Sequence, residues 1–139
     1  YRVTTRLAAA RHDAEDIKTI CSFQKSFETA VNERDVLAMI ATNRDFHVAI
    51  AVAGRNRHYT DLFTRLLDEG RRILRLYYSS FNDVLPRHYV TEHEDMIDAI
   101  KERDVDKADR LAIAHADQIV QQIRSYIAAD TRQSNDLLL

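Results

Sequence analysis

Apolar residues recur every three or four positions along most of the chain, which is the period of amphipathic helices. Acidic capping residues, two glycines and a short polar loop separate these stretches. The predicted helical segments lie near residues 1–10, 13–31, 35–54, 57–79, 89–100 and 104–126, with a loop at residues 80–86. The pattern therefore predicts an all-α domain.

Glycine and capping residues suggest where some of these helices end or bend. Gly54 is expected to end its helix in the left-handed conformation that glycine tolerates. Gly70 costs about 1 kcal/mol relative to alanine inside a helix, so it is expected to mark a kink or a close approach by another backbone. Thr91 and Glu94 match a capping box, although that helix could also begin directly after Pro86.

The composition narrows the fold and function classes. A chain of 139 residues is long enough for one domain with a core. Only 2 Gly and 1 Pro exclude an all-β sandwich or barrel, which needs frequent turns. With no run of about 18 apolar residues and no secretory leader, no membrane association is expected. The net charge of -2 argues against nucleic-acid binding by this piece, because phosphate contacts need a basic surface.

Cysteine usage and the first residues suggest the setting of the chain. The single Cys21 excludes a disulfide framework and a multi-cysteine zinc site, and it favours the reducing cytoplasm. The first apolar stretch begins at Tyr1 without a capping residue before it. We therefore expect the chain to begin inside a longer protein.

Three of the six histidines fall on apolar helix faces. His47 lies in the stripe of Ile40 and Ile50, and His93 and His115 occupy equivalent positions in two later helices. Buried polar groups cost free energy unless they are paired, so inward histidines are informative. The remaining three, His12, His58 and His88, are expected at the surface.

The spacing of these residues suggests that they meet. Asn43 and His47 are four positions apart, so they project from one helix face one turn apart. His93 and His115 each lie eleven residues from Asp104. If Asp104 marks the turn of an antiparallel hairpin, both lie about 16 Å from that turn, at the same level. The four side chains can therefore converge on one point in a bundle core.

Spacing alone leaves two interpretations open. Neutral imidazoles bind Zn, Ni, Cu, Fe or Co, and an amide oxygen can add a further ligand. The same residues can also be hydrogen-bonded core histidines without a metal. A metalloprotease motif is absent, because Ile97 stands where the second histidine would be.

Sequence stretches in a fixed order carry a family resemblance. They are NRDFHVAIAVAGRN at residues 43–56, EHEDMIDAIKERDVDKA at residues 92–108, and His115 on the last helix. Together they closely resemble the FCD domain, the helical C-terminal ligand-binding domain of FadR-type regulators in the GntR family. The resemblance implies that residues 1–130 form an antiparallel bundle of six to seven helices. Residues 131–139 are expected to form a frayed tail.

The resemblance also implies a metal site and a regulatory role. It places one divalent transition metal, with zinc or nickel favoured, on Asn43, His47, His93 and His115. It implies a homodimer and a small carboxylate effector that controls DNA binding by a winged-helix domain absent from this chain, without enzymatic activity. Many relatives have Asp at the position of Asn43. A neutral amide is a poorer donor, so weaker or effector-dependent metal binding is expected.

An arginine is expected to pair with the effector carboxylate. Arg71, Arg72 and Arg75 are candidates on one helix, and Arg75 is preferred because counting back across the loop brings it roughly level with His93. Tyr77 and Tyr89 are predicted pocket walls. A solvated basic stripe and ordinary core tyrosines are the alternatives.

Two other functions fit the same residues. One is a metal-dependent enzyme acting on a small organic acid, for which Glu92 or Glu69 would have to be the general base. The other is a structural dimerisation domain whose three inward histidines are satisfied by hydrogen bonds.

Overall fold

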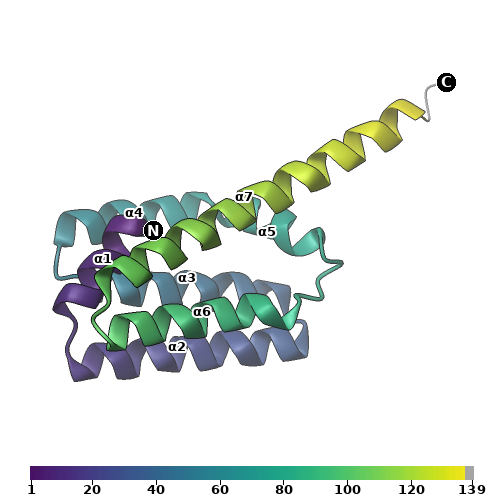
Figure 1. Cartoon of the computed structure of the whole chain (residues 1–139). Coiled ribbons are helices and arrows are strands. Elements are labelled where there is room, and N and C mark those ends of the chain that lie inside the picture. Colours follow the sequence, from purple (N-terminus) through teal and green to yellow (C-terminus); the bar gives the residue numbers. More distant parts are fainter. Residues whose placement is uncertain (137–139) are drawn as a thin grey trace.

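The computed structural model describes residues 1–136, with side-chain surroundings for residues 1–129. Seven helices and no strand make up this part of the chain, which confirms the predicted all-α bundle. The helices are α1 (Arg2–Arg11), α2 (Ala14–Glu33), α3 (Val36–Ala53), α4 (Arg57–Glu69), α5 (Arg71–Ser79), α6 (Arg87–Lys101) and α7 (Val105–Asp136). Helix α3 is central and packs against α1, α2, α4 and α5, while α7 packs against α1, α5 and α6 (Figure 1).

Acidic residues begin three of the helices, as the sequence predicts. The Asp13 carboxylate accepts hydrogen bonds from the backbone N–H groups of Glu15 and Asp16 in a capping box before α2. Asp35 accepts a bond from the first turn of α3, and Asp104 does the same for α7. Each cap satisfies a backbone N–H that the helix itself leaves unpaired.

The predicted helix over residues 57–79 is divided in two at Gly70. Gly70 ends α4 and precedes α5, and no side chain caps the second helix. A Cβ at Gly70 would meet only the carbonyl oxygens of Leu66 and Leu67, both from the end of α4. The glycine therefore marks a bend, and the alternative of a close approach by another element is wrong.

The close approach occurs instead at Gly54. A Cβ there would lie 2.9 Å from Cβ of Leu7 on α1, a separation that real side chains do not tolerate. Gly54 has a φ of -71°, so the prediction of a left-handed conformation at this residue is wrong. The next residue, Arg55, is the left-handed one, with a φ of 54°. Gly54 therefore allows α1 to pack directly on the end of α3.

Helix α6 begins directly after Pro86, with Arg87 as its first residue. The sequence left two start positions open for this helix, and the start at a Thr91 capping box is wrong. The Thr91 hydroxyl lies one turn inside the helix and donates to the carbonyl of Arg87. Proline supplies the fixed φ that suits a helix start and lacks the N–H that would need a partner.

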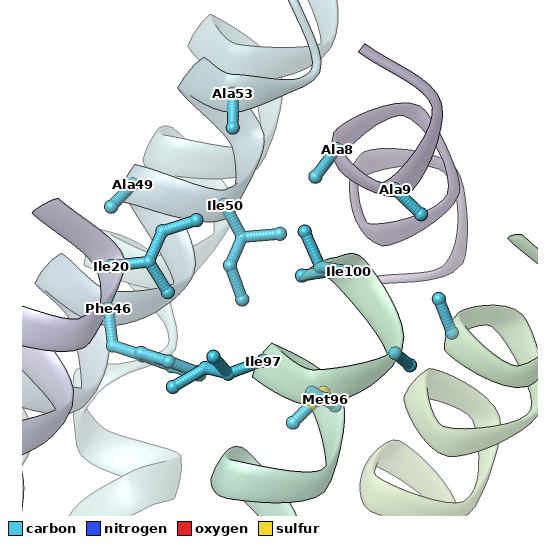
Figure 2. Packing of buried hydrophobic residues seen from close by; sticks show 12 residues of the cluster. Ala8, Ala9, Ile20, Phe46, Ala49, Ile50, Ala53, Met96, Ile97 and Ile100 are labelled. Carbon is cyan, nitrogen blue, oxygen red and sulfur yellow. The ribbon is translucent and has the colours of Figure 1, made fainter. Parts of the chain in front are cut away.

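An apolar cluster occupies the end of the bundle nearest the α6–α7 turn (Figure 2). It combines small residues of α1 and α3 with larger side chains of α2, α3 and α6. Its members are Ala8, Ala9, Ile20, Phe46, Ala49, Ile50, Ala53, Met96, Ile97, Ala99, Ile100 and Ala108. Full burial of one isoleucine side chain contributes roughly 1.5–3 kcal/mol, so these residues supply much of the driving force for folding.

The composition of α3 alone would suit a membrane span. By its length and its mean hydropathy, this helix could cross a membrane. However, α3 has helices packed on several sides and carries the buried polar residues Asn43 and His47. Its apolar composition is accounted for by its central position in the bundle.

Helix α7 extends well beyond the other helices (Figure 1). It continues to Asp136, so the segment 131–136 belongs to this helix. The frayed tail expected at residues 131–139 overlaps that helical segment, and residues 137–139 lie outside the described residues.

Candidate metal centre

Three imidazoles from three different helices meet inside the bundle. His47 comes from α3, His93 from α6 and His115 from α7, and all three are buried. One ring nitrogen of each lies within 4.8 Å of the others. The ring centroids are 5.0 to 5.3 Å apart, so the rings form a nearly equilateral triangle. We call these three side chains the histidine centre.

Two nitrogens of the histidine centre have no hydrogen-bond partner. The Nε2 atoms of His47 and His115 are fully buried and unpaired. An unpaired buried polar atom costs about 1–3 kcal/mol, so natural proteins keep few of them. Their position beside one another identifies the centre as a place where a ligand is expected.

Hydrogen bonds to Nδ1 orient two of the imidazoles. His93 Nδ1 donates to Oε1 of Gln24 over 2.9 Å, and Gln24 Nε2 in turn donates to the carbonyl oxygen of Val90. His115 Nδ1 donates to Oε2 of Glu92 over 2.9 Å. A proton on Nδ1 leaves the lone pair on Nε2, which is the arrangement that metal-binding histidines use.

Burial keeps two of the imidazoles neutral. Desolvation lowers the pKa of His47 and of His93 well below 6.5, and the charge that a neighbouring imidazole would carry lowers both further. Both rings are therefore neutral at physiological pH. A neutral imidazole is the form that binds a cation.

Aromatic side chains enclose the centre. Phe46 stacks on His93 with ring centroids 4.1 Å apart. On the other side, the Tyr1 ring meets His47 and His115 edge-on, at 4.7 and 5.6 Å, and touches Phe63 at 5.1 Å. Burial raises the pKa of the Tyr1 phenol to about 12, so this ring brings no negative charge to the site.

The fourth predicted ligand, Asn43, lies one turn before His47 on α3 and is also buried. Its amide nitrogen has no hydrogen-bond partner. Rotation of the amide exchanges Nδ2 for Oδ1, and the oxygen is the atom that can face a cation. Asn43 is therefore a buried side chain on the helix of His47 whose amide nitrogen has no hydrogen-bond partner.

The two predicted effector arginines lie on α5, a helix that carries none of the three histidines. The Arg75 guanidinium pairs with the Asp83 carboxylate at 2.7 Å and bonds Oγ of Ser79, and Arg72 is exposed on α5. Arg75 follows the bend at Gly70, and a local carboxylate engages its side chain, so its role toward an effector stays a prediction.

The two predicted tyrosines pack beside each other. Tyr77 and Tyr89 have ring centroids 6.1 Å apart within a second apolar cluster. Tyr77 is buried and exchanges hydrogen bonds with Gln118 of α7. Burial raises the pKa of the Tyr77 phenol, and the nearby charge of Glu92 adds to this effect. Tyr77 thus links α5 to α7, and its role as a pocket wall stays a prediction.

The other three histidines were expected at the surface, and two residues that contact the histidine centre were not predicted from the sequence. His58 and His88 are exposed as predicted, but the surface assignment of His12 is wrong: it is buried, and its Nδ1 donates to the carbonyl of Ala8. Gln24 was missed although it interrupts the apolar stripe of α2, the same signal that identified the histidines. No pattern singled out Tyr1 as part of the site.

Comparisons with known proteins agree with this fold. The FCD domain family model matches residues 2–118. A solved structure, E. coli McbR/YncC, matches with a TM-score of 0.71 and 16% sequence identity over 96% of this chain and 59% of that chain. This likeness shows a shared fold, and the chain spans 59% of that protein. No curated protein matches the chain significantly in sequence. Because the family model matches most of its residues, the chain belongs to the FCD domain family.

Proposed function

We propose that this domain binds one divalent transition metal through His47, His93 and His115. The observation that supports this most strongly is the pair of buried, unpartnered Nε2 atoms within a triangle of three buried imidazoles. Nitrogen ligands of one zinc ion lie about 2.1 Å from it, so each ring needs to move inward by about 1 Å or less. Zinc or nickel suits three imidazoles.

Three histidine ligands leave coordination positions on the metal for a fourth protein ligand and for an effector. Asn43 would add a weak ligand through Oδ1, in place of the carboxylate of many relatives. Three protein ligands leave a coordination position for a small molecule. A carboxylate effector would supply oxygen there, with Tyr77 and Tyr89 as the predicted walls of its pocket. The predicted effector pair Arg75 and Arg72 would contribute only if Arg75 released Asp83.

The role that best fits this family is effector sensing by a transcription regulator of the GntR class. FCD domains are the C-terminal effector domains of FadR-type regulators in that class. The metal and effector would fix α3, α6 and α7 relative to one another and so favour one of two arrangements of the protein. An N-terminal winged-helix domain would transmit this to DNA, and the regulator would act as a homodimer in the cytoplasm.

The contacts of two glutamates argue against an enzyme. A metal-dependent hydrolase would need a free general base beside the metal. Glu92 accepts the Nδ1–H of His115, and Glu69 pairs with Arg65 on the surface of α4. Both acids that the sequence offers therefore have other roles, and the proposed function is non-enzymatic.

Metal analysis tests the proposal. The chain, purified without chelator and dialysed against zinc, is expected to hold one ion per molecule by plasma mass spectrometry. The double variant His93→Ala with His115→Ala is expected to hold almost none. The matched control is His58→Ala, which removes an exposed histidine and should keep full occupancy.

A folding check keeps this test decisive. The substitutions His93→Gln and His115→Gln preserve polarity and approximate size, and circular dichroism verifies that the helices are retained. Equal, near-zero zinc in the native chain and the variants would refute the metal site. Full zinc in the double variant would assign the ion to another position.

A further inference from the structure

An apolar groove lies on the far side of Tyr1 from the histidine centre. It has a volume of about 300 Å³ and runs between the α4–α5 bend and α7. Its walls are Tyr1, Phe63, Leu66, Leu67, Gly70, Ile73, Leu74, Ala116, Ile119 and Val120. Apart from the phenol of Tyr1, no charged or polar side chain lines it. We call this space the apolar groove.

The groove and the histidine centre share a wall. The Tyr1 ring lies 4.7 Å from the His47 ring and 5.6 Å from the His115 ring, and it also lines the groove. Ala116, the neighbour of His115 on α7, lines the groove as well. One aromatic ring therefore separates an apolar space from two unpartnered imidazole nitrogens.

The groove is deep at one end and open at the other. Phe63, Leu67 and Leu74 are buried in its floor, whereas Leu66, Ile73 and Val120 are about half exposed at its rim. Gly70 contributes no side chain where α4 meets α5, which keeps the rim open. A ligand that enters from solvent would cover apolar surface at the rim and reach the ring of Tyr1 at the inner end.

We propose that the effector is a monocarboxylic acid with a hydrocarbon tail, whose carboxylate reaches the histidine centre and whose tail occupies the apolar groove. This proposal rests on the proposed metal centre, which would receive the carboxylate. The Tyr1 ring turns aside to join the two spaces. The volume is at the small end for ligand sites and has room for a hydrocarbon chain of six carbons or more. A short polar diacid would leave the groove uncovered and place a second charge among apolar side chains.

Chain-length dependence is the direct test. Titration calorimetry of the zinc-loaded chain is carried out with propanoate, hexanoate and succinate. Each methylene buried in a half-open groove is expected to tighten binding about threefold, so hexanoate should bind about 25-fold more tightly than propanoate. Succinate should bind more weakly than hexanoate. Equal affinities for propanoate and hexanoate, or tighter binding of succinate, would overturn the proposal.

Substitutions in the groove sharpen this test. Leu66→Gln with Ile73→Gln makes the rim polar without touching a buried side chain, and Ala116→Leu fills the inner wall. Both changes are expected to reduce the ratio of hexanoate affinity to propanoate affinity from about 25-fold to less than about threefold, while propanoate binding is retained. The matched control is Leu62→Gln, which lies on α4 with similar exposure but outside the groove and should keep the preference.

The same measurements separate this proposal from the metal site. A native chain that takes up no zinc contradicts the proposed function itself. A chain that takes up zinc but shows no chain-length preference contradicts only the assignment of the groove. If sedimentation shows that the Leu66→Gln and Ile73→Gln variant changes a dimer into a monomer while hexanoate binding persists, the groove belongs to a second copy and the proposal is wrong.

Discussion

Helices α3, α6 and α7 each contribute to two neighbouring interiors, the apolar cluster and the histidine centre. His47 lies one turn before Ile50 on α3, and His93 lies one turn before Ile97 on α6. The apolar cluster has no polar side chain to satisfy, whereas the histidine centre keeps two buried nitrogens unpaired. The first interior therefore stabilises the fold by itself, whereas the second has two polar atoms that the proposed metal would bind.

The largest expected effect comes from damaging the apolar cluster. Ile100 is fully buried, so Ile100→Ala is expected to lower the free energy of unfolding by about 4 kcal/mol. Zinc stoichiometry should be unchanged in the folded variant, because the histidines lie elsewhere on the helices. Urea denaturation measures the effect. Leu37→Ala, at a position 74% exposed, is the control and should change stability by less than about 0.5 kcal/mol.

Supplying a ligand to the histidine centre should produce the next largest effect. Zinc at a hundredfold excess over its dissociation constant is expected to raise the free energy of unfolding by about 2.7 kcal/mol, because it binds the folded state alone. Chelator should reverse this gain. The Ile100→Ala variant should gain the same amount, whereas the variant lacking His93 and His115 should gain nothing. A gain in that double variant would contradict the assignment.

Acidification should distinguish the two interiors in the metal-free chain. The pKa values of His47 and His93 are lowered by burial, so the unfolded chain takes up protons near pH 6.5 while the folded chain does not. The contribution of these two histidines to the free energy of unfolding is therefore fully present above pH 6.5, and it is lost as the pH falls below that value. Between pH 7.5 and 5.5 we expect a loss of about 2–3 kcal/mol by urea denaturation. The double variant His47→Gln with His93→Gln should lose far less over this range.

The smallest expected effect concerns the orientation of the His93 ring, one of the proposed metal ligands. Gln24→Ala removes the acceptor of the His93 Nδ1–H and should weaken zinc binding about tenfold, measured by competition with a chromophoric chelator. Gln122→Ala, which removes a hydrogen bond to Ser80 farther along α7, is the control and should leave zinc affinity unchanged. Unaltered affinity in the Gln24 variant would mean that packing against Phe46 alone fixes the His93 ring.

The sequence predicted those features that repeat along one helix. The caps at Asp13, Asp35 and Asp104 follow from local chemistry, and the equal spacing of His93 and His115 from Asp104 anticipates their meeting. Both depend on the regular rise of one helix or one hairpin. These regularities need no knowledge of how distant elements cross.

Features that depend on how the chain folds back on itself, or on where helices cross, could not be predicted. The close approach at Gly54 depends on where α1 crosses α3, and the pairing of Arg75 with Asp83 depends on how the following loop folds back. His12 is a surface residue by position but finds a carbonyl acceptor at the end of α1. Tyr1 reaches the site only because α1 packs against both α3 and α7.

The origin of the three imidazoles in α3, α6 and α7 has a consequence for the kinetics of folding. His47 and His115 are separated by nearly half the chain, so the site exists only after the last helix has docked. If α7 docks after the folding transition state, the proposed ion would stabilise contacts that are absent from that state. It should therefore slow unfolding while leaving the refolding rate nearly unchanged, so that a loaded domain persists by kinetic trapping.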